Sequence, residues 1–512
     1  MDILSSTIRE LLVKSEAEHG TWDAFRYKVK KPNAEGKKAV AIESKTYTDL
    51  KNDSECFSAA LAALGEQKKH IAVLGTSSYE WVVAYLGIVN SGSVAVPLDA
   101  QLPDEDLCDL LSRAEVTTLV FDESKADAAS AALKSCPELK HVISLSNESK
   151  VEGAKSFWSV VREQNPGFDH EPQPEDLATI MFTSGTTGKS KGVMLSQRNL
   201  AENATCLDMK IKPGTVLLSV LPIHHAYCLS MDILKGISLG SVICINDSLM
   251  RVAKNIELFK PEMILMVPLM IETFAKKLEE VAMLPAPIIK AKVFGKQFHT
   301  ICSGGAYLNP AYLDTFKKYG INILQGYGMT ECSPVISTNL EWHNKVGSVG
   351  KLMPNCEAKT VDDELWVKGS SVMQGYYHMP EETAATLEDG WLKTGDLGYV
   401  DEDGFIFLTG RKKNLIITPN GENVSPEEIE NKLGENRLVQ EVLVRDSEGV
   451  IEAEIFPDYE YAKKKKIKDI QNELQGMIDA YNKEAPLYKR VFKLKVREVE
   501  FEKNTTKKIK RF

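Results

Sequence analysis

The sequence predicts an α/β protein with a large N-terminal part of several subdomains, in which helices flank mixed sheets, and a small α+β C-terminal domain. Three observations lead to this prediction. The chain has 512 residues, more than one hydrophobic core usually serves. Short apolar, β-branched runs alternate with segments of helical period up to about residue 306, which is typical of sheets covered by helices. After residue 400 the pattern changes, so we predict two domains, 1–409 and 410–512.

The N-terminal strands should be short and mostly buried. We expect them at 70–77, 93–99, 117–122, 141–145, 177–182, 215–222, 240–247, 263–268 and 300–306. Within this part, residues 81–98 carry no charge and resemble a membrane span in composition. Asn90, Gly92 and Pro97 interrupt the stretch, so it predicts a helix over about 79–89, a turn and a strand over about 93–98. No transmembrane segment is expected.

The C-terminal part begins with a strand, a basic cluster and a second short strand. Ser425 and Pro426 then predict the start of a helix, because serine caps helices and proline suits the first helical position. A longer helix is expected over 462–484. Its apolar face would consist of Ile467, Ile470, Leu474, Met477, Ile478 and Tyr481.

Composition and charge narrow the class of protein. The chain is 43% hydrophobic and 26% charged, as in ordinary globular proteins rather than disordered ones. Its formal net charge of -10 argues against nucleic acid as the main partner. The nine cysteines form no CxxC pair, which indicates reduced thiols rather than a zinc site. No apolar leader opens the chain, so we expect a cytoplasmic location.

The strongest local signal is a loop suited to binding phosphate. After the strand at 177–182 come Thr183, Ser184, Gly185, Thr186, Thr187, Gly188, Lys189, Ser190, Lys191 and Gly192. Glycines let backbone N–H groups turn toward an anion, hydroxyls add donors and lysines supply positive charge. A polar surface loop is the plainer alternative. The segment also nearly fits the nucleotide-binding pattern G-x-x-x-x-G-K-[ST], but Thr183 replaces its first glycine, and a strand rather than a helix is expected to follow.

Three other segments carry less specific signals. Residues 325–331 follow an apolar strand and contain a tyrosine, a threonine and a glutamate. The tyrosine can stack on a base, the threonine can hold a phosphate oxygen and the glutamate can bind Mg²⁺; alternatively, the segment is a turn in the core. Residues 303–306 end a strand with small side chains that admit a flat base or an acyl chain, or that make a tight turn. Asp396 follows a glycine, where its carboxylate can accept hydrogen bonds from two ribose hydroxyls or can serve a turn.

Together these segments resemble the adenylate-forming superfamily, which includes acyl-CoA synthetases, luciferases and the adenylation domains of peptide synthetases. The loop at 183–192 is similar to its phosphate signature, with Ser190 where proline is usual. Residues 325–331 are similar to its G-Y-G-x-T-E motif. The tail at 502–511 resembles P-K-T-x-S-G-K-I-x-R, with Glu502 in place of proline and Lys507 in place of glycine. The resemblance covers roughly residues 40–512 and is closest to bacterial fatty acyl-CoA ligases.

The resemblance implies a role for each matching residue. Phosphate binding is assigned to Thr183, Ser184, Gly185, Thr186, Thr187, Gly188 and Lys191, and the adenine edge with the start of the acyl pocket to Gly304, Gly305 and Ala306. Tyr327 would stack on adenine, Thr330 would contact the α-phosphate, Glu331 would bind Mg²⁺, and Asp396 and Arg411 would bind ribose. Lys413 would be the hinge and Lys508 the catalytic lysine. Lys507 is a second candidate amine, and the C-terminal domain is expected to be mobile.

The implied reaction has two steps. ATP and Mg²⁺ convert a small carboxylate into an acyl-adenylate with release of pyrophosphate, and Lys508 would neutralise charge in this step. A thiol, from coenzyme A or from the pantetheine arm of a carrier protein, then takes the acyl group. Rotation about Lys413 would bring residues 420–423 to the tunnel for this second step.

The acid is suggested by residues 221–227, which resemble the segment that contacts the acyl group. His225 stands where a histidine or an aromatic residue is usual, as a gating or as a structural side chain. Amino-acid-activating relatives carry an aspartate at the next position, whereas this chain has Ala226, so an ammonium group would lack a partner. We therefore expect a fatty or other apolar carboxylate. The alternatives are an acyl-carrier-protein ligase, a luciferase-like oxidoreductase and a P-loop ATPase that would release ADP instead of AMP.

Overall fold

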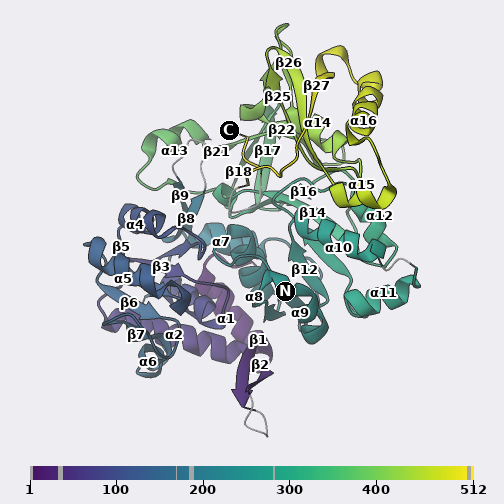
Figure 1. Cartoon of the computed structure of the whole chain (residues 1–512). Coiled ribbons are helices and arrows are strands. Elements are labelled where there is room, and N and C mark those ends of the chain that lie inside the picture. Colours follow the sequence, from purple (N-terminus) through teal and green to yellow (C-terminus); the bar gives the residue numbers. More distant parts are fainter. Residues whose placement is uncertain are drawn as a thin grey trace.

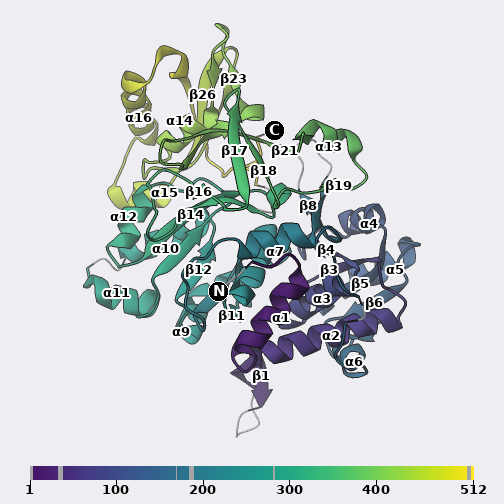
Figure 2. The same cartoon turned by 180° about the vertical axis from the view of Figure 1, so that it is seen from behind.

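The computed structural model describes the chain except for residues 1–3, 33–37, 169, 184–189, 281–282, 504–508 and 512. It is an α/β protein in which a large N-terminal domain is followed by a smaller C-terminal domain (Figure 1). The β1–β2 hairpin projects from the end of the molecule that lies opposite the C-terminal domain, as both views show (Figure 2). Among the described residues, no helix combines the length and the apolar character that a membrane crossing requires.

An eight-stranded sheet organises the first part of the chain. Its strands, in spatial order, are β19 (Gly375–Tyr376), β9 (Lys191–Ser196), β8 (Leu177–Thr183), β4 (Val94–Leu98), β3 (His70–Leu74), β5 (Val116–Phe121), β6 (His141–Ser144) and β7 (Lys155–Ser156). The helices of this part are α2 (Tyr47–Ala63), α3 (Tyr79–Asn90), α4 (Asp104–Arg113), α5 (Ala126–Ser135), α6 (Phe157–Arg162) and α7 (Gln197–Thr205). Strands β4 and β5 are buried at every position, in keeping with their β-branched, apolar sequences.

The second large sheet has nine strands. Its order is β16 (Lys351–Leu352), β15 (Val335–Thr338), β14 (Asn322–Gly328), β13 (Thr300–Ser303), β12 (Met263–Met266), β10 (Val216–Ser219), β11 (Val242–Ile245), β1 (Asp23–Pro32) and β2 (Lys38–Thr46). The associated helices are α1 (Ile8–His19), the π-helical η2 (Cys228–Leu234), α8 (Lys235–Ser238), α9 (Val252–Phe259), α10 (Pro268–Glu280), α11 (Ala286–Val293) and α12 (Ala311–Lys317). One hydrophobic core runs between this sheet and the first.

A five-stranded sheet leads toward the end of the large domain. It contains β17 (Cys356–Val361), β18 (Glu364–Gly369), β21 (Trp391–Val400), β20 (Leu387–Glu388) and β22 (Ile406–Arg411), with α13 (Pro380–Thr386) beside it. The C-terminal residues then build β23 (Ile416–Ile417), β24 (Asn423–Val424), α14 (Pro426–Leu433), β25 (Val439–Ser447), β26 (Val450–Pro457), α15 (Tyr459–Lys465), α16 (Ile470–Glu484) and β27 (Val491–Val496). These C-terminal elements have a hydrophobic core of their own, which includes Ile429, Leu474 and Ile478.

Most of the predicted elements are confirmed. Each expected N-terminal strand is present, usually with a shorter extent, and the uncharged stretch at 81–98 is helix α3, a turn and strand β4. The expected single helix over 462–484 is wrong, because the chain turns between α15 and α16. Lys466 takes a left-handed conformation with φ 58°, and Asp469 caps α16 by accepting a hydrogen bond from the backbone N–H of Asn472.

The predicted start of helix α14 is confirmed, but its expected cap is not. Ser425 occupies the N-cap position, but its side chain accepts no capping hydrogen bond from a backbone N–H of the helix. Its hydroxyl donates instead to the Thr409 carbonyl at 2.8 Å, and this bond ties α14 to the end of β22.

Candidate active site

The candidate site lies where parallel strands of the nine-stranded sheet end. Strands β10, β12, β13 and β14 run in parallel, so their carboxyl ends meet at one edge. Ser303 of β13 pairs with Gln325 of β14, which places Gly304 beside the segment that carries Tyr327. Ligands of open α/β sheets bind at this edge, and the sequence motifs at 303–306 and 325–331 are brought together there.

Asp396 joins two of the predicted residues. Its carboxylate accepts a hydrogen bond from the Tyr327 hydroxyl at 2.6 Å and forms an ion pair with the Arg411 Nε at 2.7 Å. Asp396 and Arg411 face each other across the β21–β22 pair. Burial, and then the charge of Asp396, hold the pKa of Tyr327 well above its usual value, so the phenol stays a donor. The three residues expected at adenine and ribose therefore form one cluster, in which Tyr327 and Asp396 are buried and Arg411 is partly exposed.

A second cluster connects the phosphate loop with Glu331. The Tyr376 hydroxyl donates to Glu331 Oε1 at 2.9 Å, and the Lys191 Nζ lies 4.6 Å from the centre of the Tyr376 ring. Burial, and then the charge of Glu331, raise the pKa of Tyr376. Thr330 opens the short helix η4 (Thr330–Cys332) that presents Glu331. The sequence did not point to Tyr376, whose place depends on the pairing of β19 with the distant β9.

The chemistry of Glu331 fits a magnesium ion. Mg²⁺ prefers oxygen ligands and usually binds to one or two carboxylates together with substrate phosphates. Tyr376 donates to Oε1 of Glu331, and the second carboxylate oxygen, Oε2, is the atom suited to a metal. Among the described residues, no three or more His, Cys, Asp or Glu side chains are grouped so that they could hold a metal ion.

The tip of the phosphate loop lies outside the described residues. This applies to Ser184, Gly185, Thr186, Thr187 and Gly188. The two ends of the loop are described: Thr183 of β8 pairs with Lys191 of β9 in an antiparallel hairpin.

The chain after the loop forms strand β9, as predicted. A P-loop would continue directly into a helix, so its geometry is not formed here. The Ser190 carbonyl accepts a hydrogen bond from Arg113 at 2.5 Å, a contact that the sequence did not reveal because α4 is far away in the chain.

The segment expected to contact the acid lies beside this edge. The rings of His225 and His224 are 4.7 Å apart, and His224 Nε2 is 3.7 Å from Asp99. Burial, and then His225, lower the pKa of His224 to about 4, against the opposing effect of Asp99. Gly304 is buried, whereas Gly305 and Ala306 are exposed, with Gly305 at φ +85°. A histidine pair therefore stands where a single histidine was expected.

The C-terminal tail is anchored on both sides of its tip. Lys508 lies outside the described residues, but Lys503 and Ile509 form an antiparallel bridge, and the Lys510 N–H donates to the Glu502 carbonyl at 2.9 Å. The side chain of Ile509 packs against a small core that contains Phe501. The described residues on the two sides of 504–508 are thus paired with each other, unlike a loose basic end.

Arg511 connects the tail to the predicted hinge. Its guanidinium pairs with both oxygens of Glu430 and lies 3.2 Å from Glu427. Burial, and then Arg411 and Arg511, lower the pKa of Lys413, so these cations share one region. The tail consequently ends close to the Asp396–Arg411 pair.

Two ion pairs bridge helix α10 and the C-terminal domain. Glu279 receives two hydrogen bonds from Arg437, at 2.8 and 2.6 Å, and Lys276 lies 3.0 Å from Asp458.

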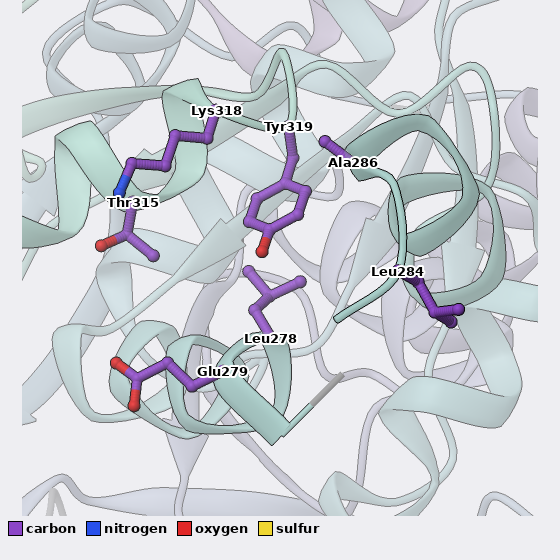
Figure 3. Close-up of a pocket in the computed structure, with 7 residues that line it drawn as sticks. All are labelled: Leu278, Glu279, Leu284, Ala286, Thr315, Lys318 and Tyr319. Carbon is purple, nitrogen blue, oxygen red and sulfur yellow. The ribbon is translucent and has the colours of Figure 1, made fainter. Parts of the chain in front are cut away.

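Glu279 also lines a cavity of about 390 Å³ between α10, α11 and α12 (Figure 3). Its other lining residues are Leu278, Leu284, Ala286, Thr315, Lys318 and Tyr319. This cavity shares no residue with the clusters around Asp396 and Glu331.

Comparison with known families agrees with this architecture. A sequence model of the AMP-binding enzyme family matches residues 26–377, and a model of the AMP-binding enzyme C-terminal domain matches residues 413–511. The chain therefore belongs to the AMP-binding enzyme family. Proteins of this family with the present fold form adenylates, and the chain is an enzyme of the acid–thiol ligase type.

Individual relatives resemble most of the chain. A long-chain-fatty-acid–CoA ligase of Bacillus subtilis is 29% identical, with 80% of each chain covered. A 2-succinylbenzoate–CoA ligase of Listeria monocytogenes is 30% identical over 79% of this chain and 82% of the relative. The solved structure of o-succinylbenzoate CoA synthetase from Bacillus subtilis matches with a TM-score of 0.77 at 26% identity, covering 98% of this chain and 96% of the other. All three relatives are named as CoA ligases or synthetases; one name gives a long-chain fatty acid and the other two give succinylbenzoate.

Proposed function

We propose that this enzyme is an ATP-dependent acyl-CoA ligase that activates a fatty or other apolar carboxylic acid through an acyl-adenylate. The observation that carries the proposal is the pair of clusters at the sheet edge, one centred on Asp396 and one on Glu331. Carboxylates that receive hydrogen bonds or ion pairs on fixed strands can hold a ribose and a metal-bound phosphate in defined positions. The arrangement suits a reaction in which positioning and charge neutralisation supply most of the catalysis.

Each cluster has a distinct part in the proposed first step. Asp396, oriented by Tyr327 and Arg411, accepts hydrogen bonds from the ribose hydroxyls. Lys191, Thr330 and the loop at 183–188 contact the phosphates. Mg²⁺ on Glu331 would supply positive charge at the phosphates. Lys508 lies next to the anchored Ile509, and we assign it the neutralisation of the carboxylate and the α-phosphate as they react.

The second step needs a thiol at the same carbonyl carbon. We propose that the C-terminal domain turns about Lys413, which removes Lys508 and brings residues 420–423 to the site. Coenzyme A is the proposed acceptor, and a carrier protein's pantetheine arm is the alternative. The proposal includes a cytoplasmic location.

The decisive assay supplies ATP, Mg²⁺ and a panel of carboxylic acids, with and without coenzyme A. We expect AMP and pyrophosphate in equal amounts, and an acyl-CoA thioester when coenzyme A is present. Formation of ADP and phosphate would refute the proposal. If a thioester formed only with a carrier protein, the acceptor would be the pantetheine arm of that protein and not coenzyme A.

The catalytic amine can be identified by a matched pair of variants. Lys508→Ala should lower acid-dependent ATP–pyrophosphate exchange by at least about 100-fold, because it removes the cation at the reacting oxygens, and it should leave thiolysis of supplied acyl-adenylate largely intact. Lys507→Ala, which removes the neighbouring amine, should retain most of the exchange. Full exchange activity in Lys508→Ala would exclude Lys508 from the mechanism.

A further inference from the structure

Two asparagines of helix α7 lie on the same face of the helix. Asn199 and Asn203 are four positions apart, and they are 6% and 0% exposed. Asparagine does not favour a helix interior, and burying its amide is unfavourable unless the amide is hydrogen-bonded. The partners of these two side chains therefore show what the face of α7 holds.

Asn203 binds the chain on both sides of the turn that follows Glu331. Its Nδ2 donates to the Val335 carbonyl at 2.8 Å and lies 3.3 Å from the Cys332 carbonyl, while its Oδ1 accepts from the Val335 N–H at 3.2 Å. Cys332 ends helix η4, which carries Glu331, and Val335 begins β15. One buried side chain thus fixes the exit of the helix that presents the expected metal ligand.

The same face of α7 holds a second segment, residues 370–372. Asn203 Nδ2 also donates to the Ser371 hydroxyl at 2.8 Å. Asn199 Nδ2 donates to the carbonyls of Ser370 and Val372, at 2.7 and 3.0 Å. The backbone on both sides of Ser371 is therefore tied to α7.

This second segment leads directly back to Glu331. The Met373 N–H donates to the Glu331 carbonyl at 2.9 Å. Three residues further along, the Tyr376 hydroxyl donates to Glu331 Oε1 at 2.9 Å. Both the backbone and the carboxylate of Glu331 consequently contact the stretch of chain that Asn199 and Asn203 hold in place.

Helix α7 is also continuous with the phosphate loop. It follows β9, whose first residue is Lys191 at the end of that loop. Mg²⁺ requires nearly octahedral geometry with ligand distances of about 2.0–2.1 Å, and it usually joins one or two carboxylates to substrate phosphates. A carboxylate that serves such an ion must be held within about 0.5 Å of its working position.

We infer that Asn203, together with Asn199, is a positioning residue for Mg²⁺, because it holds Glu331 in a fixed place relative to β9 and Lys191. The inference rests on the proposed function and assigns part of it to two side chains on α7 that contact Glu331 only through other residues. If the asparagines merely stabilised the fold, their loss would lower stability and leave the Mg²⁺ dependence unchanged.

Hydrogen–deuterium exchange of the full-length enzyme without nucleotide or metal tests the structural half of the inference. The Met373 N–H bonds to Glu331 and not to Asn203. In Asn203→Ala it should nevertheless exchange at least about tenfold faster than in the wild type, because the segments on both sides of that bond lose their attachment to α7.

Asn255→Ala is the matched control for the loss of a buried, hydrogen-bonded asparagine. Asn255 lies on α9, is 1% exposed and bonds through its side chain to Lys28, Asn246 and Asp247. Its removal should destabilise the protein comparably, since it also breaks hydrogen bonds of a buried amide. It should leave the exchange of the Met373 N–H at the wild-type rate.

The functional half is tested by the Mg²⁺ concentration that gives half-maximal ATP–pyrophosphate exchange. In Asn203→Ala this concentration should rise by about tenfold or more, and most of the wild-type rate should return at saturating Mg²⁺. The Kd for AMP, measured by calorimetry without metal, should stay the same, because the Asp396 cluster is unchanged. Asn255→Ala should retain the wild-type Mg²⁺ dependence.

Asn199→Asp decides the matter if Asn203→Ala does not fold. Asn199 Oδ1 accepts from the Ser196 N–H at 2.8 Å, and an aspartate keeps this cap while it loses the donor to residues 370 and 372. It should shift the Mg²⁺ dependence in the same direction.

Wild-type Mg²⁺ dependence in a folded Asn203→Ala or, failing that, in Asn199→Asp would overturn the inference, as would an equal shift in Asn255→Ala. An unchanged Met373 exchange rate in Asn203→Ala would overturn it as well. All these results leave the ligase assignment intact. If the wild type released no pyrophosphate with any acid, the proposed function itself would fail, and the inference with it.

Discussion

Asp396 shows how much a single buried carboxylate organises in this enzyme. It is 4% exposed, it forms an ion pair with Arg411, and one of its oxygens accepts a hydrogen bond from the Tyr327 hydroxyl. A buried charge with both an ion pair and a hydrogen bond is held in one orientation, which is what recognition of two ribose hydroxyls requires.

Removing the tyrosine hydroxyl should loosen that carboxylate. In Tyr327→Phe we expect the KM for ATP to rise by about tenfold, because a hydrogen bond to a charged group contributes about 1.5–3 kcal/mol. The ring remains, so stacking on adenine should persist. The KM is measured by ATP–pyrophosphate exchange at saturating acid. Tyr399→Phe is the control, because it removes an exposed phenol from β21, the strand that carries Asp396. Equal KM values for the wild type and Tyr327→Phe would show that the Asp396 contact does not serve ATP.

His224 makes stability depend on pH in a defined direction. Its pKa is about 4 in the folded protein, mainly through burial, whereas an unfolded histidine has a pKa of about 6.5. Between these values the unfolded chain binds more protons, so the free energy of unfolding falls as the pH falls from about 6.5 to 4. At pH 5 the loss is about 2 kcal/mol relative to pH 7.

The variant His224→Gln tests this linkage. It cannot take up a proton, so its free energy of unfolding should fall less than that of the wild type between pH 7 and pH 5. The measurement is the urea midpoint at both pH values. Parallel behaviour of the two proteins would mean that His224 does not cause the acid sensitivity.

At the scale of single elements, the break between α15 and α16 shows where local sequence stops being informative. The apolar spacing continues from Ile467 to Tyr481, and periodicity alone joins the two helices. The backbone interrupts them at Lys466, which adopts φ 58° although lysine has no special preference for that region. After this turn, the Ile467 backbone N–H donates to the Ala462 carbonyl at 2.9 Å, and the Ile467 side chain packs against the core of the C-terminal domain.

Lys466→Gly should therefore stabilise the C-terminal domain by about 1 kcal/mol, because glycine reaches a positive φ without the steric cost that a Cβ atom brings. The urea midpoint of the transition that reports on this domain measures the effect. Lys464→Gly is the control, since it lies inside α15 and should destabilise by a similar amount. A loss of stability in Lys466→Gly would show that the lysine side chain matters more than the backbone.

The sequence predicts elements with a continuous local pattern and does not predict those that depend on contacts between distant segments. Strands β3, β4 and β5 were predictable because buried parallel strands consist almost entirely of apolar, often β-branched residues. The two-residue strand β19 was not, since nothing local distinguishes it. It pairs with β9 through Gly375 and Met194, which are about 180 residues apart in the chain, and this pairing sets the position of Tyr376. Tyr327, Glu331 and Asp396 could be predicted as site residues because their motifs are continuous, whereas Arg113 and Tyr376 reach the candidate site from elsewhere in the chain.

At the scale of the whole molecule, the proposed rotation of the C-terminal domain depends on the segment that joins it to the large domain. Short helix η5 (Lys412–Asn414) carries the predicted hinge, and Lys412 on it pairs with Glu364 of the large domain at 2.8 Å. The hinge therefore sits between an anchored residue and the small domain. Rotation there requires the backbone of Lys413 to move freely in φ.

Lys413→Pro fixes that φ angle and should slow thioester formation far more than adenylation, by at least about tenfold, since only the second step requires the rotation. Pyrophosphate exchange and single-turnover transfer from acyl-adenylate to coenzyme A separate the two rates. Lys413→Ala is the matched variant, because it removes the same side chain and leaves the backbone free. If Lys413→Pro slowed adenylation and thioester formation equally, Lys413 would not be the hinge.

The Arg437–Glu279 pair on α10 has a consequence for the energy of such a movement. Both side chains are reached by solvent, with 38% and 49% of their areas exposed. Breaking such an exposed ion pair costs little free energy, because water solvates each charged group after they separate. Separating an apolar surface would instead expose carbon atoms to water, which is unfavourable. If the C-terminal domain rotates as proposed, contacts of this kind would be broken and formed again at little cost.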